Sequence, residues 1–234
     1  MTDTNIDLIQ DTKQKIIKLL TPSGWADKLR TFLTSQDMDK LLETLLQESK
    51  EGRNFTPTLK DVFNAFIKCP FDSMRAVIIG QDPYPQFGVA DGLAFSCSKT
   101  GKPQASLRYI FSSIENTIYQ DFPTHQDPDL TRWAEQGVLL INSAFTCQID
   151  KPGSHKEIWN DFMFMVIDAI NFKGGGIPVV LMGKYAQAYA PYIIQPTILC
   201  THPAAAAYAK ANEWDNSDCF NKINALLKDN PIKW

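Results

Sequence analysis

The stretch VIIGQDPYPQFGVADGLAFS, from Val77 to Ser96, is the part of the chain that decides the fold and points to a site. Its first residues are an apolar run with the composition of a buried strand. Immediately after this run come a glycine, an amide, a carboxylate, a proline and a tyrosine, which are Gly80 to Tyr84. A strand that ends in this way brings polar side chains to the edge of a sheet, where ligands of α/β proteins bind. We therefore expect a functional site at the end of this strand.

Short apolar runs with the length and composition of buried parallel strands occur at four places in the chain. They are Ala76–Ile79, Val138–Ile141, Val179–Met182 and Ile198–Cys200. The stretches between them are long enough for helical crossovers. Apolar residues also recur at helical spacing over residues 38–46, 62–67 and 159–170, which indicates helices that pack on a core. The sequence predicts an α/β fold with a central four-stranded, mostly parallel sheet flanked by helices.

Groups that can hydrogen-bond or take part in a reaction follow each of the four runs. They are Gln81-Asp82, Asn142-Ser143, Gly183-Lys184 and Thr201-His202. Because the carboxyl ends of parallel strands meet at one edge of a sheet, a single crevice could collect Asp82, Asn142, Lys184 and His202. For any one of these residues, a solvated loop is the simpler explanation. The indication of a site therefore comes from the four together.

Length and charge set the frame for this interpretation. With 234 residues, of which 44% are apolar, the chain is expected to form one domain over residues 1–234. Residues 1–24 are expected to be a helical N-terminal extension of that domain. The net charge of −3 counts mildly against nucleic-acid binding, so any binding to DNA needs a local positive field.

The cysteines and the hydropathy indicate a compartment. The five cysteines are odd in number and include no Cys-x-x-Cys pair, which favours reduced thiols over a structural zinc or iron–sulfur site. No segment approaches membrane-spanning length, and the N-terminus has no cleavage-site pattern. We expect a cytoplasmic protein without a membrane partner.

Several motifs together resemble one family. GQDPYPQFGVADGLAFS is similar to the GQDPYH…GLCFS signature of family 1 uracil-DNA glycosylases. The further segments that resemble that family, in the same order along the chain, are GVLLINSAFT, SHKEIWNDF, LMGKYAQ, THPAAAAY and the final PIKW. The similarity covers roughly residues 25 to 234. The motifs are highly specific in combination.

The resemblance implies an activity and partners. Such enzymes hydrolyse the N-glycosidic bond of deoxyuridine in single- and double-stranded DNA and so start base-excision repair, without a metal or a redox cofactor. The nucleotide must be flipped out of the stack into a pocket that reads the base edge. The resemblance further implies a monomer and, as a protein partner, a DNA-mimicking inhibitor of the kind that blocks this family.

The same resemblance assigns the catalytic groups. Asp82 is implied to position the attacking water and to stabilise positive charge on the sugar. His202 is implied to donate a hydrogen bond to uracil O2 as a neutral imidazole, because the site already holds a carboxylate and a leaving anion. For each of these residues alone, a structural role in a turn is the competing interpretation.

Base recognition is implied for four more residues. The Asn142 amide would accept from uracil N3–H and donate to O4, a pattern that cytosine reverses. Tyr84 would leave no room for the methyl group of thymine, Phe95 would stack on the base, and Gln81 would contribute backbone N–H groups. Tyr84 or Phe95 taken alone could equally be a core aromatic residue.

Contacts to DNA are implied for three loops. The segment from Pro103 to Ser106 matches the family's proline-rich loop, and Gly183-Lys184 matches its Gly-Ser loop. Residues 204–208 match its leucine loop. Together these loops would hold the phosphates around the flipped nucleotide.

The chain departs from the family pattern at three places. Pro85 replaces a histidine that touches the DNA backbone, and Asp91 replaces another histidine, which would place a negative charge near the mouth of the site. In the segment HPAAAAY, Ala206 occupies the position of the leucine that wedges into the base stack, and a methyl group fills less of that gap. Tyr208 supplies the wedge if the loop is one residue shorter, whereas the alanines by themselves favour a helix.

Two functions from different classes follow. The first is an active uracil-DNA glycosylase, because the implied chemical residues are all present. The second is a non-enzymatic DNA-binding or scaffold protein with the same fold, which the altered wedge segment and the acidic composition motivate. The intact set of chemical residues favours the enzyme.

Overall fold

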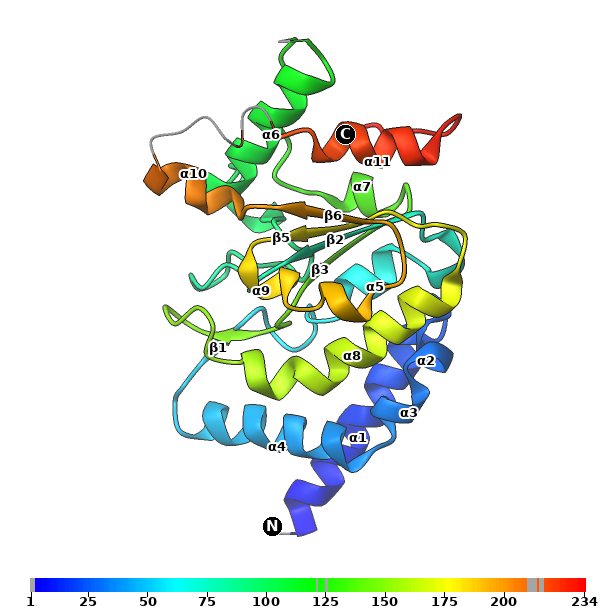
Figure 1. The fold of residues 1–234 in the computed structure, drawn as a ribbon. Helices are drawn as coiled ribbons and strands as arrows, with labels where there is room; N and C mark the ends of the chain where they lie inside the picture. The colour runs from blue at the N-terminus through cyan, green and yellow to red at the C-terminus, as the bar shows by residue number, and fades with distance from the viewer. Residues whose placement is uncertain (1–2, 121, 125, 210–213, 215–216) are drawn as a thin grey trace.

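The central element of the protein is a sheet of four parallel strands. A computed structural model describes residues 3–120, 122–124, 126–209, 214 and 217–234. The strands lie in the order β3-β2-β5-β6 (Figure 1). Their bounds are β2 (Ala76–Gly80), β3 (Val138–Asn142), β5 (Val179–Met182) and β6 (Thr197–Cys200). The predicted α/β class and the four predicted strands are confirmed, with each end within one residue of its expected place.

The register of the sheet brings the strand ends to one edge. Gly80 pairs with Asn142 at the end of β2 and β3, and Met182 pairs with Cys200 at the end of β5 and β6. Every residue of β2, β3 and β5 is buried, as expected for strands covered on both faces. The residues that follow these ends therefore start from neighbouring positions.

Helices cover both faces of the sheet. One group lies below the sheet in Figure 1 and the other above it. The lower group consists of α1 (Asp3–Leu20), α2 (Trp25–Lys28), α3 (Arg30–Leu33), α4 (Gln36–Lys50), α5 (Asn64–Lys68), α8 (Lys156–Lys173) and α9 (Lys184–Gln187). The upper group consists of α6 (Ala105–Thr117), α7 (Thr131–Ala134), α10 (Pro203–Ala209) and α11 (Cys219–Leu227).

Short elements complete the chain trace. Strands β1 (Phe55–Thr56) and β4 (Cys147–Gln148) form a small antiparallel pair. Single 3-10 turns occur at Phe71–Ser73, Ser98–Thr100 and Ala190–Tyr192. The pair β1-β4 brings the loop after α4 close to the loop that precedes α8.

The predicted amphipathic helices pack on the core. The hydroxyl of Ser35 accepts from the backbone N–H groups of Asp37 and Met38, at 3.2 and 3.3 Å, and so caps α4. The apolar face of α8, from Trp159 to Ile170, is buried, which confirms core packing rather than cofactor binding. The predicted helix over 62–67 is observed as the shorter α5, because residues 61–63 form turns before it.

The first helix packs on the rest of the molecule. Ile9, Ile16 and Leu20 of α1 belong to the same buried cluster as the sheet strands. The ammonium group of Lys13 lies 2.7 Å from the Asp39 carboxylate of α4. Within the described residues, no helix is both long enough and apolar enough to cross a membrane.

Candidate active site

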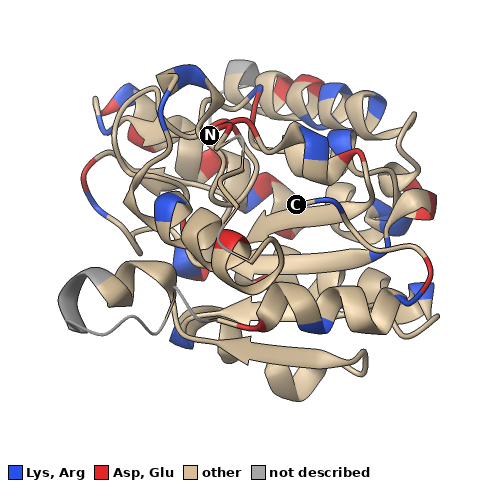
Figure 2. Ribbon diagram, turned by 90° about the horizontal axis from the view of Figure 1, so that it is seen from above, with Lys and Arg blue, Asp and Glu red and all other residues tan. Residues whose placement is uncertain are grey.

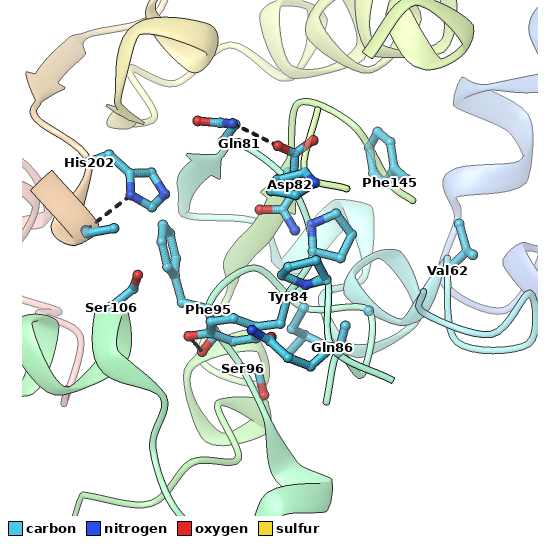
Figure 3. A pocket seen from close by; sticks show the side chains of 18 residues that line it. Val62, Gln81, Asp82, Tyr84, Gln86, Phe95, Ser96, Ser106, Phe145 and His202 are labelled. Atoms are coloured by element: carbon cyan, nitrogen blue, oxygen red, sulfur yellow. Dashed lines mark hydrogen bonds between the residues drawn. The ribbon is translucent and has the colours of Figure 1, made fainter. Parts of the chain in front are cut away.

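A cavity of about 400 Å³ opens at the carboxyl ends of the strands (Figure 3). The six residues assigned to catalysis or base recognition all line it: Gln81, Asp82, Tyr84, Phe95, Asn142 and His202. They come from the ends of β2, β3 and β6 and from the loop after β2. Side chains that are up to 121 positions apart in the sequence therefore meet in one place.

The Asp82 carboxylate has one oxygen held and one oxygen open. Oδ2 accepts from the Gln81 side-chain amide at 2.8 Å, while Oδ1 is buried and has no hydrogen-bond partner within the described part of the chain. Burial raises the pKa of the Asp82 carboxyl above its ordinary value, and the Gln81 hydrogen bond, the charge of Lys156 and the backbone N–H of Gly153 oppose that rise. The open oxygen is therefore a buried acceptor that a water molecule can satisfy.

His202 follows β6 and is held as a neutral imidazole. The backbone N–H of Ala204 donates to Nδ1 at 3.2 Å, which requires a lone pair there and places the ring proton on Nε2. Burial lowers the pKa of His202 below its ordinary value. The ring therefore offers an N–H dipole to a ligand in the cavity, without a positive charge.

Asn142 lies at the end of β3, where Gly80 of β2 leaves space for its side chain. Asn142 is only 9% exposed. A Cβ atom at Gly80 would lie 2.5 Å from Asn142 Oδ1 and 3.1 Å from Phe95 Cζ. The 2.5 Å distance would force the Asn142 amide to move, so the missing side chain of Gly80 leaves the amide its place.

Tyr84 and Phe95 form one wall of the cavity. The Tyr84 hydroxyl donates to the backbone carbonyl of Phe95 at 3.0 Å. Phe95 has a φ of 65°, a left-handed conformation that non-glycine residues rarely adopt and that costs about 1–3 kcal/mol. Its ring centroid lies 5.8 Å from that of His202. The aromatic wall is thus held by a hydrogen bond and by a strained backbone.

The residues assigned to the DNA loops fall into two groups. Pro85 and Ser106 line the cavity together with the base-contacting residues. Pro103, Gly183 and Lys184 do not line it. A Cβ atom at Gly183 would lie 2.9 Å from His202 Cβ, so the Gly-Lys segment passes directly beside the histidine, with Lys184 exposed.

The wedge segment is a helix. Residues Pro203–Ala209 form α10, so the alanines continue a helix. Ala206 is 9% exposed and belongs to the buried core. It therefore faces the protein, and a side chain there does not point outward. The side chain of Tyr208 lies outside the described part of the structure.

The Asp91 carboxylate is buried within its own loop, next to the cavity wall. It is 6% exposed, it does not line the cavity, and its two oxygens accept hydrogen bonds from its own loop. Three donors turn the carboxylate inward, and its negative charge is felt in the cavity wall, where burial, Cys97 and Asp91 raise the pKa of Tyr84.

Two features of the site carried no clear signal in the sequence. Phe145 lines the cavity although it reads as a core residue after β3. Lys156 lowers the pKa of Asp82 from a helix that is far away in sequence. Among the described residues, no group of three or more His, Cys, Asp and Glu side chains could hold a metal ion.

Comparison with known proteins identifies the family. The family model described as "Uracil DNA glycosylase superfamily" matches residues 66–228. The chain belongs to the uracil-DNA glycosylase superfamily. It is 35% identical over 235 residues to a uracil-DNA glycosylase of Acinetobacter baumannii (strain SDF), with 98% of each chain covered. It is 37% identical over 218 residues to a uracil-DNA glycosylase of Dichelobacter nodosus, with 90% of this chain and 93% of the relative covered.

Solved structures support the uracil-DNA glycosylase fold. The crystal structure of mimivirus uracil-DNA glycosylase matches with a TM-score of 0.81 at 24% identity, over 93% of this chain and 88% of that one. A variant of mimivirus UNG in complex with UGI matches with a TM-score of 0.80 at 24% identity, over 93% and 90% of the two chains.

Proposed function

We propose that the protein hydrolyses the N-glycosidic bond of deoxyuridine in DNA, releasing uracil and leaving an abasic site. One observation carries this proposal. An unpartnered carboxylate oxygen of Asp82, the neutral imidazole of His202 and the buried amide of Asn142 face a single cavity. The family membership supports the same reaction.

Asp82 acts on the sugar side of the bond. Its open Oδ1 accepts from a water molecule and orients it toward the anomeric carbon. As the bond to uracil lengthens, positive charge grows on the sugar, and a carboxylate fixed by Gln81 stabilises it without reorganising. The Gln81 hydrogen bond and the Lys156 charge favour the ionised form of Asp82 against the effect of its burial.

His202 acts on the leaving group. The uracil that departs carries negative charge, which is shared by O2. The N–H at Nε2 donates to that oxygen, because Nδ1 is already occupied by the Ala204 N–H. A neutral donor suits the step, since burial lowers the pKa of His202 and an aimed N–H dipole stabilises the departing anion without a charge on the ring.

Asn142, Tyr84 and Phe95 select the base. The Asn142 amide accepts from N3–H and donates to O4 of uracil, whereas cytosine presents the opposite pattern. Tyr84 closes the space next to C5, where thymine carries a methyl group, and its hydroxyl is fixed by the Phe95 carbonyl. Phe95 stacks on the flipped base.

DNA is held by local contacts. Acidic and basic residues are interspersed over the described residues, and Lys and Arg are not gathered on one face (Figure 2). We propose that Pro85, Pro103, Ser106 and the Gly183-Lys184 segment contact the phosphates around the flipped nucleotide. We assign the wedge to Tyr208, since Ala206 is buried.

The wider setting follows from the same proposal. The substrates are single- and double-stranded DNA that contains uracil, and a DNA-mimicking inhibitor protein is the proposed protein partner. The protein acts in the cytoplasm as a monomer. Its whole chain works as one domain, because the apolar side chains of α1 share the core of the sheet.

A uracil-containing single-stranded oligonucleotide tests the proposal. The protein is incubated with it in EDTA, and the product is cleaved with alkali. We expect strand breaks at the uracil and free uracil in solution. Breaks that need a divalent metal would indicate a nuclease instead. Binding without any release of uracil would favour the non-enzymatic DNA-binding alternative.

A further inference from the structure

The Asp91 carboxylate accepts three hydrogen bonds within the loop that carries Phe95. Its Oδ2 accepts from the Ser96 hydroxyl at 2.7 Å and from the Ser98 N–H at 2.8 Å. Its Oδ1 accepts from the Leu93 N–H at 3.2 Å. All three donors lie within seven residues of the carboxylate along the chain. The buried Asp91 carboxylate therefore closes residues 91–98 into a hydrogen-bonded loop, called the Asp91 loop below.

Phe95 lies within the Asp91 loop, between the donor residues Leu93 and Ser96. Its φ of 65° is unfavourable for a side chain with a Cβ atom, so the surrounding contacts must hold it. Its ring lines the cavity, and its carbonyl accepts from the Tyr84 hydroxyl at 3.0 Å. The positions of the Phe95 and Tyr84 side chains therefore depend on the shape of the Asp91 loop.

Other hydrogen bonds also hold the loop, and one of them, from the Ser96 N–H to the Leu93 carbonyl at 3.2 Å, spans Phe95. The Ala94 N–H donates to the Leu140 carbonyl at 3.1 Å, and the Cys97 N–H donates to the Pro128 carbonyl at 2.9 Å. These bonds anchor the two sides of the loop to neighbouring segments. Loss of the Asp91 acceptors should therefore loosen the turn at Phe95, which keeps only the Ser96–Leu93 bond across it, while the loop stays docked.

We propose that Asp91 is a positioning residue for base recognition. Through the Asp91 loop it holds Phe95 against the flipped base and Tyr84 beside uracil C5. This inference rests on the proposed function, because it concerns the same cavity. Asp91 itself does not line the cavity, so its effect passes through Phe95.

The substitution Asp91→Asn probes the carboxylate with almost no change of volume. Both oxygens of Asp91 accept from backbone N–H groups, so either orientation of an amide places its NH₂ group against a backbone donor. The matched control is Asp39→Asn on α4. Like Asp91, Asp39 is an aspartate that accepts several hydrogen bonds, in its case from the Lys13 and Gln10 side chains. It does not line the cavity.

The readout is inhibition of uracil release by free uracil and by thymine, measured below the melting temperature of each variant. We expect Asp91→Asn to weaken uracil inhibition by about tenfold, as for one lost charge-assisted hydrogen bond. Thymine inhibition should weaken less, which narrows the discrimination between the two bases. Asp39→Asn should change both inhibition constants by less than about twofold, whatever it does to the melting temperature.

The inference is overturned if Asp91→Asn binds uracil and thymine as the unchanged protein does, even with a lower melting temperature. If Asp91→Asn does not fold, Ser96→Ala removes the hydroxyl donor to the same carboxylate, and with it the acceptor of the Leu130 N–H. It should weaken uracil inhibition by a few-fold, and an unaltered inhibition constant then overturns the inference. If the unchanged protein neither releases uracil nor is inhibited by it, the proposed function itself has failed.

Discussion

The cavity at the strand ends and helix α10 differ in how they are built. In the cavity, each chemical group is fixed by the sheet or by a named hydrogen bond, as for Asp82, Asn142 and His202. In α10, alanines replace the leucine-loop pattern, and Ala206 is turned into the core. The comparison teaches that reaction and base choice need rigid positions, among them Ala204 at the start of α10, whereas the rest of the segment that matches the leucine loop departs from the family pattern.

The strongest way to break this comparison is to remove the open oxygen of Asp82. Asp82→Asn should lower the rate of uracil release by about 10²–10⁴-fold, because the amide neither activates water nor stabilises positive charge. The variant should melt at an equal or higher temperature at neutral pH, because burial raises the pKa of Asp82 and the ionised form is the costly one. Release kinetics and thermal melts measure both effects.

Asp72→Asn is the control for this prediction, because the Asp72 side chain is fully exposed. It should leave the release rate unchanged. A rate for Asp82→Asn within about threefold of the unchanged protein would remove Asp82 from the mechanism.

The next largest effect concerns the choice of base. Asn142→Asp should lower uracil release by roughly 10- to 100-fold, because a buried group is then mismatched with the base edge. Cytosine release should rise, since the protonated carboxyl presents the opposite hydrogen-bond pattern. Paired oligonucleotides with one uracil or one cytosine measure the two rates. If uracil release is unaltered, the assignment of Asn142 is wrong.

The next prediction concerns Gly80→Ala, which adds a methyl group to the backbone of β2 beside the Asn142 amide. Gly80→Ala places a Cβ atom within 2.5 Å of Asn142 Oδ1, so the amide must move. We expect a loss in kcat/KM of about tenfold, carried mainly by KM. Gly52→Ala is the control, because a Cβ atom there meets nothing within 4 Å although its φ of +75° adds backbone strain. Equal kinetics for the two variants would contradict the packing argument.

Acid should weaken the fold through His202. The pKa of His202 is lowered by burial, so the unfolded chain takes up a proton more readily than the folded chain. The stability from the neutral ring is present above pH 6.5 and declines as pH falls through the lowered folded pKa. His202→Gln should lose less stability than the unchanged protein over this range. Denaturant unfolding at several pH values measures the free energy of unfolding of both proteins. An equal loss of stability in the two proteins would contradict the prediction.

The smallest effect on uracil release is expected in α10. Ala206→Leu should destabilise the protein by about 1–3 kcal/mol through overpacking. It should not raise the rate on duplex DNA, because residue 206 faces the core. The ratio of duplex to single-strand rates is the measurement. A clear gain on duplex DNA would show that the side chain reaches the base stack after all.

Much of the fold could be predicted because its strands are continuous apolar runs, with polar groups directly after Ile79, Ile141, Met182 and Cys200. The rule for parallel sheets predicted one crevice for Asp82, Asn142, Lys184 and His202. The first, second and fourth of these line the cavity, whereas Lys184 does not. What could not be predicted depends on contacts between distant segments. The inward turn of Asp91 needs three donors in one loop, and the burial of Ala206 needs the packing of α10.

The most direct test of the central claim is a crystal structure with bound uracil. The base should lie in the cavity at the strand ends, with the Asn142 amide against N3–H and O4 and with His202 Nε2 donating to O2. Tyr84 should lie beside C5, and Asp82 Oδ1 should remain free on the side where the sugar was. Uracil bound elsewhere, or with its N3–H and O4 edge turned away from Asn142, would contradict the account.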